Sequence, residues 1–348
     1  MKPASYLTAL GVRDDEIVAY LEEVDRQLYP YLVKTTAKTP KVYPLHEGVA
    51  LQIASGKRRL RAAFCVTTCE LFSGSYKEAL YFAAAIEHLQ NSMLIHDEIT
   101  RTDDEADLRQ SIVRRFGMPQ AINIGDIFIC LSSLAIADAP YDTELKLKLL
   151  ELLCDQGFIT AEGLNLDINL RKNDYATTDD YFNCAKKKTG SFLAMAARGG
   201  AIIGGAQKDM IQLLNNYSTL AGVAYDVGEE LFDIRPNMAR PRGMKIRHGA
   251  RTLLGIHAAA NATAADRKKL RSILQKPRET ITEHDIDWTI ALYNKTDSVK
   301  YAEGIVRSIT RNALRYLKRV PESDAKDKLV RISQYYSRKY DLALVTEL

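Results

Sequence analysis

Long segments of helical period dominate this chain and constrain its fold more than any other feature of the sequence. In the first of them, 13–33, Ile17, Leu21, Val24 and Leu28 are spaced by four, three and four residues, which places them on one face of a helix. Alternating β-branched residues, the usual mark of a strand, are nearly absent. The sequence therefore predicts an all-α fold.

Further helices are predicted along the rest of the chain. They contain or cover 46–54, the apolar run 62–72, 76–96, 112–137, 143–170, 178–203, 207–234, 248–262, 264–274, 283–293, 296–319 and 323–340. Only 10 Pro and 19 Gly interrupt the 348 residues, and no Ser-, Gly- or Pro-rich linker separates one helix from the next. We therefore expect residues 1–348 to form a single helical domain.

Composition argues against several classes of protein. The 48 basic and 44 acidic residues give a net charge of +4, which is too mild to indicate a nucleic-acid partner. The N-terminus, MKPASYLTALGVRDDE, becomes charged too early for a secretion signal, and we expect no run close to the ~20 apolar residues that span a bilayer. The cysteines are scattered and lack zinc-ligand spacing: Cys65, Cys69, Cys130, Cys154 and Cys184. We expect a cytoplasmic protein with reduced thiols and no stable membrane insertion.

A stripe of carboxylates is the sharpest chemical signal in the chain. In LAGVAYDVGEELFDI, Asp226, Glu229, Glu230 and Asp233 follow the spacing i, i+3, i+4 and i+7, so all four lie on one face of a helix. Like charges at this spacing repel one another, and the stripe has no Lys or Arg at helical spacing to relieve it. A solvated helix face normally mixes both signs, so a cation site is the better interpretation.

A second acidic cluster lies earlier, in SMLIHDEITRTDDEADLRQS at 92–111. Asp97 and Glu98 follow directly on an apolar run, whereas the acidic residues of 103–107, taken alone, could form an ordinary solvated loop. Because burying unpaired charge is costly, carboxylates at the end of a packed helix indicate a bound cation. Mg²⁺ is suitable, since it takes oxygen ligands and is usually completed by substrate phosphates and water.

Basic groups accompany the two acidic clusters. They are Lys57, Arg58, Arg59 and Arg61 in GKRRLR, Arg109 after the first cluster, and Lys186, Lys187 and Lys188 before Thr189-Gly190. Acidic metal sites with separate basic patches suit a diphosphate, because metals bridge its oxygens while Arg and Lys hold the rest. The alternative for GKRRLR is a nucleic-acid surface, which the lack of interleaved aromatic residues disfavours.

The ordered set of motifs resembles the trans-isoprenyl diphosphate synthases, also called polyprenyl synthetases. GKRRLR, LIHDEITRTDDEADLR, KKTGSF and YDVGEELFDI occur in the family's order, and FGMPQAINIGD, EGLNLD and PRGMKIRHGARTL add to the match over roughly 50–340. The fold that this resemblance implies is a single bundle of antiparallel helices around a large central cavity, usually as a homodimer. The two acidic motifs would lie on opposite walls near the cavity mouth.

The activity implied by the resemblance is that of a prenyltransferase. An allylic diphosphate is ionised with the help of three Mg²⁺, the double bond of isopentenyl diphosphate attacks the allylic cation, and proton loss gives an all-trans prenyl diphosphate longer by one isoprene unit. Both substrates are therefore expected partners of this chain.

The resemblance also assigns roles to individual residues. The implied metal ligands are Asp97, Glu98, Asp103, Glu229, Glu230 and Asp233. Isopentenyl diphosphate would contact Lys57, Arg58, Arg61, Gln90 and Gln110. The allylic diphosphate would contact Arg109, Lys188 and Arg240, while Thr189 and Tyr225 would line the cation region. Arg109, Lys188, Thr189 and Tyr225 are the residues predicted to be catalytic.

Four positions depart from the family pattern. Gln110 stands where an arginine is expected, Asp226 and Leu164 stand where glutamines are usual, and Lys245 stands in place of an aspartate. These changes affect the isopentenyl diphosphate site more than the metal sites. They leave open two alternatives: a class I terpene cyclase or lyase on the same scaffold, and a weakly catalytic partner subunit of a hetero-oligomeric prenyl synthase.

Product length is predicted from the helix that precedes the first acidic cluster. Ser92 and Met93 lie five and four residues before Asp97, where helix geometry turns them towards the growing tail. Short-chain members of the family often have Phe or Tyr at the position of Ser92. Serine should leave a deeper pocket and a product of geranylgeranyl length or longer, unless Met93 or Leu89 closes it. The alternative is that Ser92 only allows close helix packing.

Overall fold

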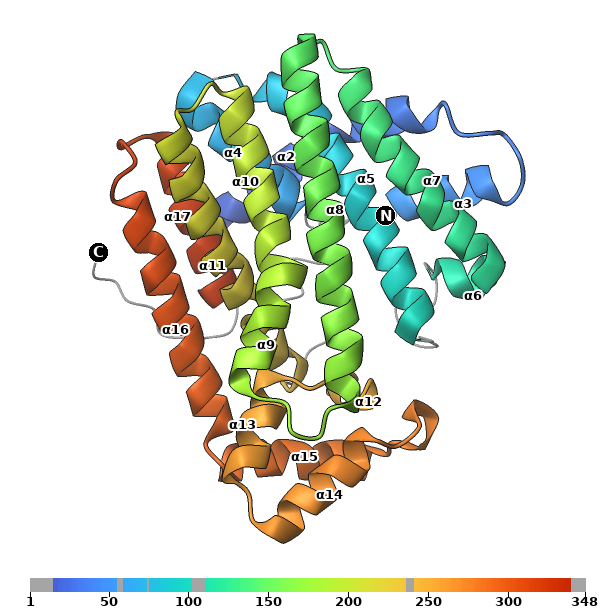
Figure 1. Ribbon diagram of the computed structural model, residues 1–348, viewed down its shortest axis with the longest axis vertical. Helices are drawn as coiled ribbons and strands as arrows, with labels where there is room; N and C mark the ends of the chain where they lie inside the picture. Colours follow the sequence, from blue (N-terminus) through green and yellow to red (C-terminus); the bar gives the residue numbers. More distant parts are fainter. Residues whose placement is uncertain (1–14, 55–58, 74, 102–110, 236–240, 339–348) are drawn as a thin grey trace.

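The computed structural model describes residues 15–54, 59–73, 75–101, 111–235 and 241–338. These residues form helices joined by short connections, and none of them is in a strand (Figure 1). The all-α prediction is thereby confirmed.

The first half of the chain supplies most of the bundle. Its helices are α2 (Asp15–Thr36), α3 (Leu45–Ala54), α4 (Leu60–Ser73), α5 (Tyr76–Arg101), α6 (Ile112–Phe116), α7 (Met118–Ala137) and α8 (Thr143–Lys172). The second half adds α9 (Thr178–Ala185), η1 (Lys186–Gly190), α10 (Ser191–Ile203), α11 (Lys208–Asp233), α12 (Met244–Arg247), α13 (Leu253–Asn261), α14 (Ala264–Leu274), η2 (Arg278–Thr280), α15 (Glu283–Lys295), α16 (Ser298–Leu317) and α17 (Asp324–Arg338).

Side-chain caps explain where several of these helices begin. Asp142 accepts a hydrogen bond from the backbone of the first turn of α8. Thr177 with Asp180, and Thr282 with Asp285, form capping boxes at α9 and α15. Each box satisfies two backbone donors that the helix itself leaves unpaired.

Two hydrophobic clusters hold the helices together. The larger lies among α2, α4, α5, α7, α10 and α11, where α5 packs along α7 and α10 packs between α4 and α11. The smaller joins α13, α14 and α15 to α16 and the C-terminal half of α11. The C-terminal ends of α5 and α11 both point towards the end of the bundle where α12 and α13 lie (Figure 1).

Two predicted helices are interrupted in the structure. The segment 112–137 divides into α6 and α7 at Gly117, whose φ of 81° no right-handed helix accommodates. The segment 178–203 contains the π-helix η1 between α9 and α10. Helical periodicity continues across both breaks, which is why the sequence did not reveal them.

Two further helices have different bounds from those predicted. Helix α5 continues through Asp97 and Glu98 to Arg101 rather than ending at residue 96. The segment 248–262 becomes helical only at Leu253, and the short α12 before it was not predicted. Both differences bear on the site, because they place the acidic residues of α5 on a helix and bring two helix N-termini close to α11.

Helix α7 is long and apolar enough, by length and composition, to cross a membrane, with a mean hydropathy of 1.6. The expectation that no run in the chain approaches this limit was therefore wrong. One face of α7 packs on α5 and α3, where the fully buried Phe128 faces His88 of α5 and the fully buried Ile124 lies against Gly48 of α3. The opposite face leaves Ile122 and Ile129 exposed, so an apolar surface remains on this side of the bundle.

Candidate active site

The carboxylate stripe lies on the C-terminal half of α11, as its spacing predicted. Glu230 and Asp233 are buried, at 3% and 1% exposure, while Asp226 and Glu229 are partly exposed. Glu230 accepts a hydrogen bond of 2.8 Å from the backbone N–H of Leu253, and Asp233 accepts one of 2.9 Å from that of Lys245. Two of the four carboxylates therefore cap the first turns of α12 and α13, whose unpaired N–H groups favour negative charge.

A lysine lies against this stripe. The amino group of Lys245 is 4.0 Å from a carboxylate oxygen of Asp226 and 3.9 Å from one of Glu230. Asp226 and Lys245 are two of the four departures from the family pattern, and the structure brings them together as a pair of opposite charge. The stripe on α11 has no basic residue of its own at helical spacing. The positive charge beside it comes from Lys245 on α12.

The surroundings of Glu230 change its pKa. Burial raises the pKa of Glu230 to about 7, and the nearby negative charge of Asp226 acts in the same direction. The Lys245 ammonium, the Tyr181 hydroxyl and the Leu253 N–H lower that pKa. Burial also raises the pKa of Tyr181, with Glu230 and Asp226 adding to the effect.

The KKTG segment forms η1, a five-residue π-helix placed between α8 and α11. Side chains at Gly163 and Gly222 would not fit, because a Cβ at Gly163 would lie 2.6 Å from the backbone nitrogen of Lys188, and one at Gly222 would lie 2.7 Å from the Cα of Gly190. The two glycines therefore let both helices approach η1 closely. Isolated π-helical turns occur frequently at functional sites.

Lys188 projects from η1 towards α8. Its amino group lies 3.5 Å from a carboxylate oxygen of Asp167, whose other oxygen accepts a hydrogen bond of 2.8 Å from Arg171. The charges of Lys188, Asp167, Arg171 and Asp226 all influence the pKa of the Cys184 thiol, which burial raises to about 12. Gly222 packs against Gly190 of η1, so η1 meets α11 one helical turn before Asp226. Thr189, the residue after Lys188, is buried.

The described part of the first acidic cluster lies near the end of α5, where Asp97 and Glu98 are both partly exposed. The Ser111 hydroxyl donates a hydrogen bond to the Glu98 carboxylate, and the Val113 N–H donates one of 3.3 Å. Glu98 is thus tied to the beginning of α6. Asp103 lies outside the described residues.

The basic stretch GKRRLR separates into residues with different surroundings. Arg59 is turned into the interior, at 3% exposure, where it pairs with Asp25 at 2.7 Å and Glu87 at 2.9 Å. The Arg61 guanidinium lies 4.8 Å from the centre of the Phe192 ring. Lys57, Arg58, Arg109, Gln110 and Arg240 lie outside the described residues, so their assigned roles stay predictions.

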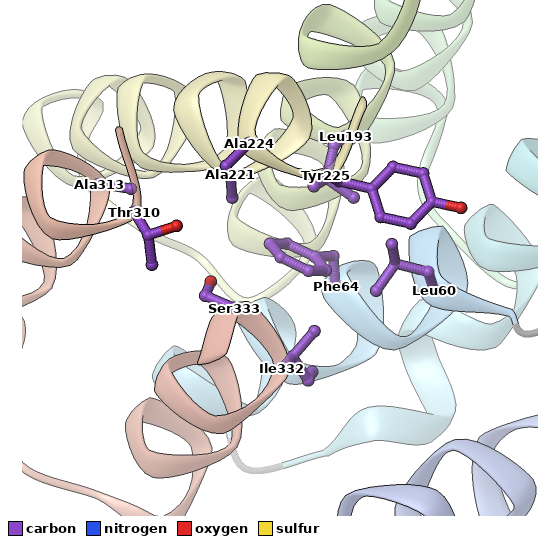
Figure 2. A pocket seen from close by; sticks show the side chains of 10 residues that line it. All are labelled: Leu60, Phe64, Leu193, Ala221, Ala224, Tyr225, Thr310, Ala313, Ile332 and Ser333. Atoms are coloured by element: carbon purple, nitrogen blue, oxygen red, sulfur yellow. The ribbon is translucent and has the colours of Figure 1, made fainter. Parts of the chain in front are cut away.

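An apolar pocket lies beside Tyr225, among α4, α10, α11, α16 and α17 (Figure 2). The Tyr225 ring is close to Leu60 and Phe64 of α4, while Thr310 and Ser333 lie on the opposite side (Figure 2). The pocket therefore lies between α4, whose second residue is Arg61, and α11, which holds the carboxylate stripe. Sequence reasoning assigned Tyr225 to the site but missed α16 and α17, which carry no recognisable motif.

The residues assigned to product length lie on α5. Ser92 is fully buried and Leu89 nearly so, while Met93 and Gln90 are partly exposed. One turn before Ser92, the His88 ring faces Phe128 of α7 at 5.9 Å between ring centres. The face of α5 that contains Ser92 is therefore packed in the interior, which keeps both the product-length role and the packing role of this serine open to test.

These features define a class of protein: an all-helical enzyme in which carboxylates, a lysine-bearing π-helix and an apolar pocket meet near one helix, α11. The sequence pattern of the polyprenyl synthetase family matches residues 44–292. The chain belongs to this family of prenyltransferases.

Individual relatives agree with this assignment. The short chain isoprenyl diphosphate synthase of Methanothermobacter thermautotrophicus is 27% identical over 81% of this chain and 86% of its own. The geranylgeranyl diphosphate synthase of Saccharolobus solfataricus is 25% identical over 89% and 93%. The crystal structure of geranylgeranyl pyrophosphate synthetase from Pyrococcus horikoshii OT3 superposes with a TM-score of 0.85 at 26% identity, covering 93% of this chain and 98% of that one.

Proposed function

We propose that this chain condenses an allylic diphosphate with isopentenyl diphosphate to form a longer all-trans prenyl diphosphate. The bond between the allylic carbon and its diphosphate oxygen breaks, a carbon–carbon bond forms to isopentenyl diphosphate, and the products are the extended chain, free diphosphate and a proton. The observation that carries the proposal is that η1, which holds Lys188, the carboxylate stripe and the Tyr225 pocket all lie along α11.

The carboxylate donors are suited to Mg²⁺, which prefers oxygen ligands. We propose that Glu229 and Asp233 on α11, with Asp97 on α5, hold Mg²⁺ against the substrate, with three ions per site. Bound Mg²⁺ would neutralise the diphosphate and stabilise its departure. A geranylgeranyl pyrophosphate synthase from Corynebacterium glutamicum, of the same fold (20% identity, TM-score 0.84), was solved with isoprenyl diphosphate and magnesium.

The protein's own groups would orient the reactants. Lys188 is held by Asp167 and would donate hydrogen bonds to the allylic diphosphate. Thr189 and Tyr225 would border the allylic cation, which the face of an aromatic ring attracts. The apolar pocket beside Tyr225 would exclude water from the reacting carbons and so protect the cation from hydrolysis.

Chain elongation is the direct test of this proposal. The protein is incubated with Mg²⁺ and geranyl or farnesyl diphosphate, with and without isopentenyl diphosphate, and the products are separated by length. We expect extension only when isopentenyl diphosphate is present, with geranylgeranyl diphosphate or a longer chain as the end product. A hydrocarbon formed without isopentenyl diphosphate would indicate a cyclase, and the absence of any product would indicate a non-catalytic partner subunit.

We also propose that the chain forms a homodimer through α7 and α8. These helices are neighbours (Figure 1), and their outward faces expose Ile122 and Ile129 of α7 and Leu147 and Phe158 of α8, at 43%, 41%, 57% and 75%. Large apolar surfaces of this kind are typical of association sites in soluble proteins.

A further inference from the structure

Lys245 contacts three of the four carboxylates of the stripe. Its amino group lies 4.0 Å from Asp226 and 3.9 Å from Glu230, and its backbone N–H donates a 2.9 Å hydrogen bond to Asp233. Asp226 and Glu230 are one helical turn apart, so a single ammonium can lie between them.

The position of Lys245 is set by its backbone and not only by a long side chain. Besides the hydrogen bond from the Lys245 N–H to the Asp233 carboxylate, the Gly243 N–H donates a hydrogen bond of 2.8 Å to the backbone carbonyl of Asp233. Met244 and Ile246, on either side of the lysine, are buried. The side chain itself is only 25% exposed. The backbone of α12 therefore places the Lys245 side chain beside the stripe.

An ammonium at this position changes what else the stripe can bind. Two of its carboxylates are already close to a positive charge, and a divalent cation placed beside the same oxygens would be repelled by that charge. At about 4 Å this repulsion is substantial even in high dielectric. Glu229, on the partly exposed side of the stripe, is the carboxylate for which the structure shows no contact with Lys245.

We infer that Lys245 is a built-in counter-cation of the second acidic motif, which neutralises Asp226 and Glu230 and lowers the affinity and number of divalent cations bound there. The inference rests on the proposed function, because it concerns the metal sites of that reaction. Metal binding by this motif then depends mainly on Glu229 and Asp233. Asp226 and Lys245 form one compensating pair, so neither departure from the family pattern acts alone.

Manganese binding to the substrate-free chain tests the inference without turnover. Free Mn²⁺ is followed by electron paramagnetic resonance in titrations of the wild type, Lys245→Met, Lys245→Asp and the double variant Asp226→Gln/Lys245→Asp. Lys245→Met keeps the length of the side chain and the backbone donor to Asp233. Lys148→Met is the matched control, because it removes one lysine charge from an exposed pair with Glu144 on α8.

We expect Lys245→Met to bind Mn²⁺ at least about tenfold more tightly than the wild type, in line with removal of one adjacent like charge. Lys245→Asp should bind more tightly still and hold about one additional ion per chain, and adding Asp226→Gln should reverse part of this gain. Lys148→Met should bind like the wild type.

Wild-type Mn²⁺ binding in a folded Lys245→Met chain would overturn the inference. So would a Lys245→Met chain that no longer folds by circular dichroism, because the lysine would then serve the fold itself. Weaker binding of geranyl thiolodiphosphate with unchanged Mn²⁺ binding would also overturn it, since Lys245 would then hold the diphosphate directly. A wild type that fails to elongate prenyl chains would refute the proposed function. It would leave intact the comparison of Mn²⁺ binding between the wild type and the Lys245 variants.

Discussion

At the scale of single residues, neighbouring carboxylates on α11 have different surroundings. Asp233 is buried and accepts the backbone hydrogen bond from Lys245, whereas Glu229 is partly exposed. Both are predicted metal ligands, and Asp233 also caps the first turn of α12. Substitutions at the two positions should therefore test catalysis, and substitution of Asp233 should also test this cap.

Glu229→Gln should lower kcat for chain elongation about 100-fold or more, because it removes a charge that supports diphosphate departure. Asp233→Ala should lower kcat similarly and also destabilise the fold by about 1–3 kcal/mol, since the N–H of Lys245 loses its acceptor. Steady-state kinetics and urea unfolding measure the two effects. Near wild-type turnover in either variant would show that the motif does not serve the reaction.

Arg59 is a buried basic residue that pairs with Asp25 and Glu87. Its replacement by Ala should destabilise the protein by about 3–5 kcal/mol, because Glu87 would be left as a buried charge without this partner. Urea unfolding at pH 7 measures the loss. The control is Lys148→Ala, which removes a pair on the surface of α8 and should change stability little. Equal effects of the two substitutions would contradict the assignment of Arg59 to the core.

At the scale of elements, α5 combines a buried polar face with the predicted product-length residues. His88 and Ser92, one turn apart, are both fully buried, and the described residues offer no hydrogen-bond partner to either side chain. Burial, together with the charge of Arg59, lowers the pKa of His88 to about 3. His88 is therefore a neutral histidine on the buried face of α5.

The neutral histidine predicts a pH dependence of stability. His88 has a lower pKa in the folded chain than its ordinary value of 6.5, so its contribution is complete above about pH 6.5 and is lost as the pH falls towards 3. The slope should approach about 1.4 kcal/mol per pH unit below pH 6. His88→Leu should remove this part of the slope in urea unfolding between pH 7 and 5. An unchanged slope would mean that other groups cause the acid sensitivity.

Ser92→Phe tests the product-length role on the same helix. A ring at this position should shorten the product distribution, because it would close the space into which the prenyl tail grows, while turnover continues. Product analysis by chromatography, with thermal unfolding as the control for packing, distinguishes the two roles of Ser92. An unchanged product distribution, or farnesyl diphosphate as the only wild-type end product, would refute the deeper-pocket prediction.

At the scale of the whole molecule, the exposed apolar faces of α7 and α8 predict the assembly state. Ile122→Asp and Phe158→Asp should convert a dimer to a monomer in light scattering after size exclusion, because a charge would be buried in the interface. Tyr29→Asp is the control, since Tyr29 is also exposed, at 45%, but belongs to α2. A wild-type monomer, or dimers in both interface variants, would refute the proposed surface.

The sequence by itself determined the helical class, the stripe on α11 and the order of the family motifs, because helical period and motif order are local properties of the chain. Only the tertiary structure decided that Arg59 enters the core while Arg61 lies over Phe192, and that Lys245 lies beside Asp226 and Glu230. It also showed the π-helix at Lys186–Gly190, where α8 and α11 approach closely. These contacts depend on how the chain folds back on itself, since residues from different helices meet only after packing has set their distances and directions.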